Sequence, residues 1–444
     1  MKKKNFAAQY GTIIIWTLFL VFWIVVSVVN NCGVYADGSY TVLKILESES
    51  LWLWYPARRV PMLLTRIFIM LLLKLKIYDF YILIKAYSFG CTFWTALFVW
   101  IASYIAYKKE TRLFELNICL WGLIIPYTGL YCMHESLLTV AICWLQFIIV
   151  YFYDQIKSRF VKIFILGLSL VTILGTHESY AILGSTLLIA CIIKYFKMNR
   201  KCDCIFYIFI VSVLLSVLQE IYGIVNSNET SRDGFLTSIQ HVDRATLFFF
   251  TVLITYVIFF SIVKFPNTLI PKCTEVLLVF YIVFFMLHDV NTIVHDTRLI
   301  RSLLHVIIPC GMIILMSLIV LFAGGVYNDI ASLISKGIIV AATGTIILIS
   351  NGYSNYLKNI NNELQNSKGF IEWTKDDSGQ VYNTDWTIPF ESIIANKIYG
   401  GDNEITSIAV QPLDEIYYQP FNMWNIDEYF DLTKFGIIYN KIYF

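Results

Sequence analysis

Four histidines of this chain are each followed directly by an acidic residue: His134-Glu135, His177-Glu178, His288-Asp289 and His295-Asp296. Each pair stands at or close to the end of a long apolar segment. Ionisable side chains at membrane depth are costly, and they usually line a cavity or a substrate path. We therefore expect the four pairs to lie on one face of the protein and to line a polar site. For any single pair, the alternative is an interfacial cap at the end of a helix.

Histidine and carboxylate side chains are also common zinc ligands. The chain has no His pair spaced i, i+4 and no HExxH segment, so we predict no metal site and no tightly bound cofactor. Cys202-Asp203-Cys204 looks like half of a metal site, but no second cysteine pair lies near it. We interpret that segment as a reduced cytoplasmic loop.

Asp37 is the first acidic residue after the N-terminal apolar segment, and Gly38 and Ser39 follow it. A carboxylate at this point could take the proton from a hydroxyl nucleophile and so act as a general base. It could equally cap the N-terminus of the next helix, because Asp and Asn are both preferred N-cap residues. The two interpretations differ in the effect of Asp37→Asn, which keeps a cap and removes a base.

The elements that hold these residues are predicted to be membrane-spanning helices. Hydrophobic residues make up 58% of the 444 residues and charged residues 14%, whereas soluble chains carry about 25% charged residues. Apolar runs of about 20 residues recur along the chain, which is typical of a polytopic helical membrane protein. This pattern excludes an ordinary cytosolic enzyme, a disordered chain and a transmembrane β-barrel, whose strands alternate with period two.

Orientation follows from the bias of Lys and Arg toward short cytoplasmic loops. The N-terminus begins Met-Lys-Lys-Lys, and we place it in the cytoplasm, with the first apolar run retained as a span rather than cleaved as a signal peptide. The rule then predicts eleven spans, at about residues 12–30, 80–106, 113–131, 136–153, 163–176, 180–196, 205–225, 246–264, 275–291, 303–323 and 337–351. All six histidines fall on the outer side of this threading.

The outer side is unusually rich in arginine. Of the 27 Lys and Arg in residues 1–351, the threading places 11 outside, and seven of these are Arg: Arg58, Arg59, Arg66, Arg232, Arg244, Arg298 and Arg301. Arg binds phosphate through a bidentate fork and Lys does not. The excess indicates an anionic ligand on that face; the alternative is anchoring to lipid headgroups.

Two outer segments complete the predicted organisation. Residues 31–78 hold a helix-like stretch through Glu47, then aromatic residues at Trp52 and Trp54, then a basic apolar stretch over 61–77 that suits a helix in the membrane interface. Residues 352–444 carry 6 Lys, no Arg and 13 acidic residues. We divide the chain into a membrane domain, 1–351, and a small acidic α+β domain, 352–444, that rests on the outer loops rather than folding alone.

This organisation resembles the GT-C superfamily of integral membrane glycosyltransferases. The shared features are a first span, an Asp at the start of a large outer loop, two helices next to the membrane, about eleven spans and a C-terminal outer domain. Within the superfamily, the length, the Ile, Phe, Tyr, Lys and Asn usage and the acidic tail look most like the serotype-converting O-antigen glucosyltransferases of enteric bacteria and their phages.

The resemblance implies a location, a donor and an acceptor. The protein would lie in the bacterial inner membrane with its C-terminus in the periplasm. It would transfer a sugar, glucose in the nearest group, from an undecaprenyl-phosphate carrier to lipid-linked O-antigen or another surface glycan, inverting the anomeric centre. Its functional partners would be a polyprenyl-phosphate glucosyltransferase and a small flippase, with no nucleic acid involved.

The resemblance also implies roles for named residues. Asp37 would be the catalytic base. The donor phosphate would contact arginine pairs, because the negative charge on the phosphate grows as its bond to the sugar breaks. The residues expected at the donor phosphate are Arg58, Arg59, Arg298 and Arg301. The residues expected at the sugar and acceptor are His134, Glu135, His177, Glu178, His288 and Asp289.

Two other classes of protein stay open. An O-antigen polymerase or ligase would also place outer Arg and His near a lipid-linked glycan, but those enzymes usually carry their largest loop between late spans, whereas here the bulk follows the last span. A lipid or sugar transporter would show internal repeats and charged groups at mid-span, and the sequence shows neither.

Overall fold

The computed structural model describes the chain in several separate ranges: residues 2–35, 37–53, 56–130, 134–199, 202–226, 305–306, 309–314, 317, 331–366, 370–372, 388–400, 408–410 and 432–437. Two predicted spans, at 246–264 and 275–291, lie outside these ranges, together with most of the span predicted at 303–323. Six residues predicted for sites also lie outside them: His288, Asp289, His295, Asp296, Arg298 and Arg301.

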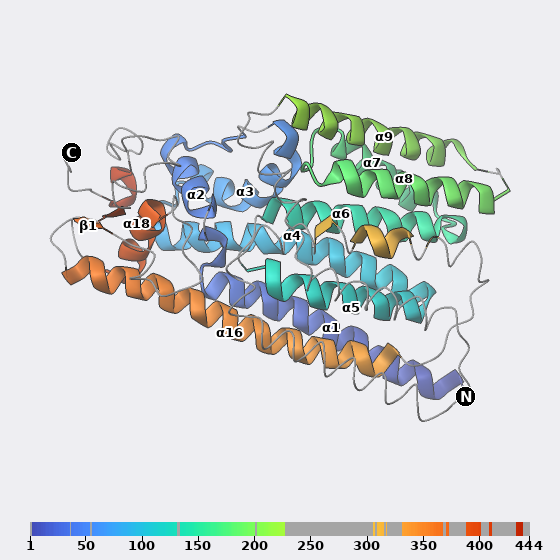
Figure 1. Cartoon of the computed structure of the whole chain (residues 1–444), viewed down its shortest axis with the longest axis horizontal. Helices are drawn as coiled ribbons and strands as arrows, with labels where there is room; N and C mark the ends of the chain where they lie inside the picture. Colours follow the sequence, from blue (N-terminus) through green and yellow to red (C-terminus); the bar gives the residue numbers. More distant parts are fainter. Residues whose placement is uncertain are drawn as a thin grey trace.

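Long α-helices form most of the described structure (Figure 1). They are α1 (Lys2–Val29), α4 (Phe80–Lys109), α5 (Thr111–Thr128), α6 (His134–Tyr151), α7 (Arg159–Thr172), α8 (Tyr180–Lys197), α9 (Cys204–Val225) and α16 (Ala331–Asn366). Each of the first seven predicted spans overlaps one of these helices, and all bounds agree to within four residues except the start of α1, which lies ten residues earlier than predicted. The apolar periodicity of the sequence was therefore sufficient to locate them.

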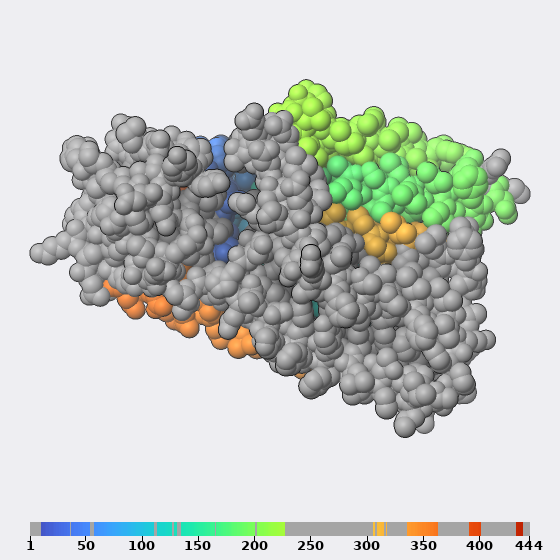
Figure 2. Space-filling view, in the orientation of Figure 1, coloured from blue at the N-terminus to red at the C-terminus, as the bar shows by residue number. Residues whose placement is uncertain are grey.

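Five described helices are long and apolar enough to cross a membrane: Tyr10–Val29, Phe80–Lys109, Tyr180–Lys197, Cys204–Val225 and Ser335–Asn362. Two shorter apolar helices cover Leu113–Pro126 and Glu135–Tyr151. In the space-filling view of Figure 2, α8 and α9 form one visible edge of the molecule, drawn in green. Exposed apolar side chains such as Val211, Leu218 and Tyr222 lie on α9, as a helix in contact with hydrocarbon requires. The chain is thus an α-helical membrane protein, and the count of eleven spans stays a prediction.

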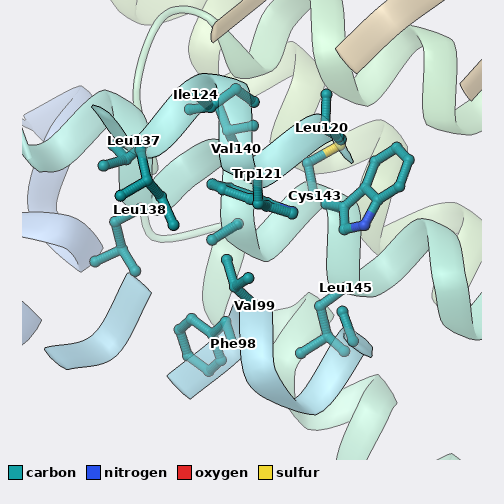
Figure 3. Packing of buried hydrophobic residues seen from close by; sticks show 14 of the residues in the cluster. Phe98, Val99, Leu120, Trp121, Ile124, Leu137, Leu138, Val140, Cys143 and Leu145 are labelled. Carbon is teal, nitrogen blue, oxygen red and sulfur yellow. The ribbon is translucent and has the colours of Figure 1, made fainter. Parts of the chain in front are cut away.

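The core lies where α1, α4, α5 and α6 meet. Figure 3 shows apolar side chains of α4, α5 and α6, among them Val99 and Val140, gathered around Trp121. A buried polar chain links all four helices: Trp16 Nε1 donates to Ser103 Oγ, Asn117 Nδ2 donates to the same oxygen, and Trp144 Nε1 donates to Asn117 Oδ1. Because every member has a partner, this network holds the helices in one register without leaving a costly unpaired group.

The segment 31–78 folds back onto the start of α4. It contains a 3-10 turn η1 (Cys32–Val34), α2 (Asp37–Ser48), a second 3-10 turn η2 (Pro56–Arg58) and α3 (Arg59–Lys74). A Cβ at Gly90 of α4 would lie 2.0 Å from the carbonyl oxygen of Thr65 in α3. Glycine at this position therefore lets the two helix backbones touch.

The C-terminal segments pack onto this folded-back region. β1 (Phe370–Glu372) and β2 (Ile408–Val410) form a two-stranded parallel sheet, beside α18 (Ile388–Tyr399) and the turn η7 (Thr433–Phe435). Phe390 of α18 contacts Tyr40 of α2, with ring centroids 5.0 Å apart, and Lys434 forms an ion pair with Glu49. A single hydrophobic cluster joins side chains of α2, α3 and α4 with those of α18.

The predicted boundary between the two domains falls inside a helix. α16 runs without a break through residue 351 and ends at Asn366, and Tyr356 beyond the boundary donates to the buried Glu391 of α18 at 3.0 Å. The C-terminal segments are therefore carried on an extension of the last described helix. In Figure 1, α2, α18 and β1 lie together at one end of the helices, and the N-terminus lies at the other.

Candidate functional site

Arg58 in η2 brings two predicted site carboxylates together. Its Nε donates to both oxygens of Glu178, at 3.2 and 3.0 Å, and its Nη2 donates to Glu178 Oε1 at 2.8 Å. Its Nη1 lies 3.5 Å from Glu135 Oε2 in the first turn of α6. The guanidinium therefore bridges side chains 77 and 120 residues further along the chain. Paired geometry of this kind is the strong form of an Arg–carboxylate contact.

Arg66 in α3 supplies a second positive charge from deeper in the protein. The residue is only 1% exposed. Its Nη1 donates to the carbonyl oxygens of Leu51 and Trp52, at 3.0 and 2.5 Å, and its Nη2 lies 3.4 Å from Glu135 Oε1. The ring of Trp52 lies 5.6 Å from the guanidinium carbon. Glu135 is thus held between two arginines, and both of its oxygens face a cation.

A tight turn between α7 and α8 presents His177 and Glu178 to this cluster. Gly175 adopts φ 106°, and its carbonyl accepts from the backbone N–H of Val60 at 3.0 Å, which ties the turn to the start of α3. His177 Nδ1 accepts from the backbone N–H of Ser179 at 3.1 Å, and His177 Nε2 lies 3.3 Å from Glu178 Oε2. The His-acid pair therefore interacts within itself as well as with Arg58.

Charge controls the ionisation of Glu178. Burial raises the pKa of this carboxyl, but the electrostatic interactions with His177 and Arg58, together with the hydrogen bonds from Arg58, outweigh burial and hold the pKa well below its usual range. Glu178 is thus a carboxylate at any physiological pH. Ionised carboxylates accept hydrogen bonds from hydroxyl groups, so the cluster can bind a polyol such as a sugar.

The side chain of Lys85 holds the end of α1, from which the chain leads to Asp37. Lys85 of α4 donates to the carbonyls of Val28 and Val29, at 2.7 and 2.6 Å, and so caps the end of α1. Asn31 then adopts φ 56° and the chain turns through η1 into α2. Asp37, half-buried, is the first residue of α2.

Tyr87 of α4 lies beside the start of α2. A Cβ built at Gly38 would lie 2.0 Å from the carbonyl oxygen of Gly33 and 3.7 Å from the ring of Tyr87, so α2 starts in close contact with its neighbours. The buried Tyr87 lies within electrostatic reach of Arg66 and Glu135. The start of α2 and the residues Arg66 and Glu135 therefore all lie in the neighbourhood of Tyr87.

The structure places the predicted site residues in different positions relative to the cluster. Arg58, Glu135, His177 and Glu178 meet in one cluster, which joins residues from two of the four His-acid pairs. The backbone of His134 begins α6 next to Glu135. Arg59, directly after Arg58, is exposed and forms no ion pair with any described residue. Within the described ranges, no group of three or more His, Cys, Asp and Glu side chains is placed to hold a metal ion.

Sequence reasoning did not select three residues that the structure places at the cluster. Arg66 holds Glu135, Glu220 of α9 accepts hydrogen bonds from Thr176 beside His177, and the buried His305 contacts Ser136 at 2.8 Å through Nδ1. Glu220 had a usable signal, since an acidic residue inside an apolar span indicates function. Arg66 had a weaker signal as one of the seven arginines predicted on the outer side, and His305 as one of the six histidines predicted there.

No family model, curated protein or solved structure that was compared with this chain matches it.

Proposed function

We propose that this chain is an inverting, polyprenyl-phosphate-sugar-dependent glycosyltransferase of the bacterial inner membrane. It transfers a sugar, glucose in the simplest case, to lipid-linked O-antigen or another surface glycan on the periplasmic face. One observation carries the proposal: Arg58, Arg66, Glu135 and Glu178 converge from four segments at the end of the bundle where Asp37 begins α2. A charged cluster of this size at the end of apolar helices supports a polar substrate.

The contacts refine the role of each arginine. The fork of Arg58 is taken up by Glu178 and Glu135, so its role is to hold both carboxylates ionised and in place. Arg59 is exposed and free of ion pairs within the described residues, so it is the arginine available to the donor phosphate. Arg298 and Arg301 stay candidates for the same role.

The reaction is a single displacement. The oxygen of the acceptor hydroxyl attacks the anomeric carbon on the face opposite the phosphate, and the bond from that carbon to the phosphate oxygen breaks. Asp37 takes the hydroxyl proton, and undecaprenyl phosphate leaves with the bonding electron pair. Glu135 and Glu178 accept hydrogen bonds from the sugar hydroxyls, and His177 can accept or donate one. His134, His288 and Asp289 are further candidates.

The experiment that tests the proposal compares two donors. Purified protein in lipid nanodiscs is incubated with a lipid-linked O-antigen acceptor and either undecaprenyl-phosphate-glucose or an undecaprenyl-diphosphate-linked glycan. We expect glucose transfer from the monophosphate donor alone. Transfer from the diphosphate donor would instead identify a polymerase or ligase, and facilitated movement of donor between leaflets without transfer would identify a transporter.

A further inference from the structure

Glu220 is a buried acid that the proposed reaction does not use. It lies in α9, within an apolar span of 22 residues, and its side chain is 0% exposed. Its Oε1 accepts two hydrogen bonds from Thr176, one from the backbone N–H at 2.5 Å and one from Oγ1 at 3.0 Å. Thr176 directly precedes His177 and Glu178. The hydrogen bonds to Glu220 therefore hold in place the turn that carries those two residues.

The packing of α7 against α9 brings Thr176 within hydrogen-bond distance of Glu220. Buried hydroxyl pairs join them one turn apart: Ser169 with Ser212, and Thr172 with Ser216. Residues 212, 216 and 220 are spaced four apart and therefore lie on one face of α9. The next contact along that face is the one between Glu220 and Thr176.

The charges around Glu220 are already balanced without it. The charged groups within its electrostatic reach are Glu178 and Arg58, and these two pair with each other through three hydrogen bonds. Within the described residues no cation forms an ion pair with Glu220, and its Oε2 has no hydrogen-bond partner there although it is buried. An ionised carboxylate that is buried without a cation, and with one oxygen lacking a hydrogen bond, is costly. Such a group takes up a proton instead.

We infer that Glu220 carries a proton on Oε2 and acts as a neutral positioning residue, which holds the turn bearing His177 and Glu178 against Arg58. As a neutral acid it lies next to Glu178 without repelling it, while Oε1 keeps both hydrogen bonds from Thr176. The importance of this turn for catalysis rests on the proposed function. The protonation of Glu220 and its hydrogen bonds with Thr176 are independent of that function.

Two substitutions separate charge from hydrogen bonding. Glu220→Gln keeps an oxygen that can accept both bonds and carries no charge, so we expect a transfer rate within about two-fold of the parent and an unchanged pH profile. Glu220→Ala removes the acceptor and leaves the Thr176 N–H unpaired. We expect it to lower kcat at least ten-fold with KM little changed. Leu218→Ala, on the exposed face of the same helix, is the control, and we expect it to leave kcat within two-fold. Loss of activity in Glu220→Gln would overturn the inference, and so would normal kcat in Glu220→Ala.

Two measurements stand without the transfer assay. Infrared spectroscopy should show the C=O stretch of a protonated carboxylic acid in the parent and in Glu178→Gln, and this band should be absent from Glu220→Gln; its absence from the parent would overturn the protonation. A thermal-unfolding cycle of Glu220→Ala with Glu178→Gln should be non-additive, and additive losses would overturn the coupling. If these results hold while no sugar transfer is seen in the parent, the proposed function fails and the inference about Glu220 stands.

Discussion

Two consecutive arginines have different environments. Arg58 is 18% exposed and is bound by two carboxylates, whereas Arg59 is exposed and forms no ion pair among the described residues. Sequence alone treats them as one pair. The structure gives them different contacts, because the guanidinium fork of Arg58 is filled by Glu178.

The two arginines should therefore respond differently to substitution. Arg58→Ala leaves Glu178 buried without its partner, which costs about 3–5 kcal/mol of stability, and Arg58→Lys loses the fork and should recover only part of that. Arg59→Ala should leave the thermal midpoint nearly unchanged and weaken donor binding by about 1.5–3 kcal/mol. Thermal unfolding and donor titration of the three variants test this. Normal donor binding by Arg59→Ala would reduce that residue to a headgroup anchor.

Glu178 should make the stability of the protein depend on pH. Its pKa is held below the usual value in the folded state, so the unfolded chain binds a proton more readily than the folded one. The stabilisation is complete above the ordinary Glu pKa of about 4.3 and is lost as the pH falls toward the depressed value. The difference in thermal midpoint between the parent and Glu178→Gln should shrink on acidification. A difference that is constant down to low pH would contradict the ion pair.

At the scale of elements, the contact between α3 and α4 depends on a glycine. Because a Cβ at Gly90 would lie 2.0 Å from the backbone oxygen of Thr65, Gly90→Ala forces the helices apart and should cost about 1–3 kcal/mol. Gly167 of α7 has no atom within 4 Å of the equivalent position, so Gly167→Ala is the control and should be neutral or stabilising by about 0.5–1 kcal/mol. Equal thermal midpoints for the two variants would contradict this helix packing.

The helices were predictable because each is encoded locally. Apolar runs ended by charged residues located seven of the described helices, and the Lys-Lys sequence at 108–109 marks the end of α4. The convergence of the His-acid pairs at 134–135 and 177–178 followed from placing them at the same end of the membrane. The partners within that cluster were not predictable, since Arg58 meets Glu178 across 120 residues.

The domain boundary shows a second limit of local reasoning. Hydropathy falls near residue 351, which predicts the end of the membrane domain there. The helix α16 nevertheless runs without a break for a further 15 residues, to Asn366. What sustains it is packing against α18, which lies more than 20 residues further along the chain.

At the scale of the whole molecule, the two ends of the bundle differ in their charged contacts. The end with the N-terminus pairs Lys162 with Asp203 and Lys194 with Asp154; the other end carries the arginine cluster. Because Lys gathers on the cytoplasmic side, reporter fusions after Lys109 and Lys201 should be cytoplasmic, and a fusion after Phe444 should be periplasmic. A cytoplasmic signal at Phe444 would contradict the proposed orientation.

The central claim is that this arrangement performs sugar transfer with Asp37 as the base. Asp37→Asn keeps the shape of the side chain and its capacity to cap α2, but it cannot take a proton from the acceptor hydroxyl. The direct test is the rate of sugar transfer from undecaprenyl-phosphate-glucose by the purified parent and by Asp37→Asn, with membrane level and donor binding measured alongside. We predict normal membrane level, normal donor binding and a rate reduced by roughly 10²–10⁴-fold. Transfer by Asp37→Asn within a few-fold of the parent would contradict the claim.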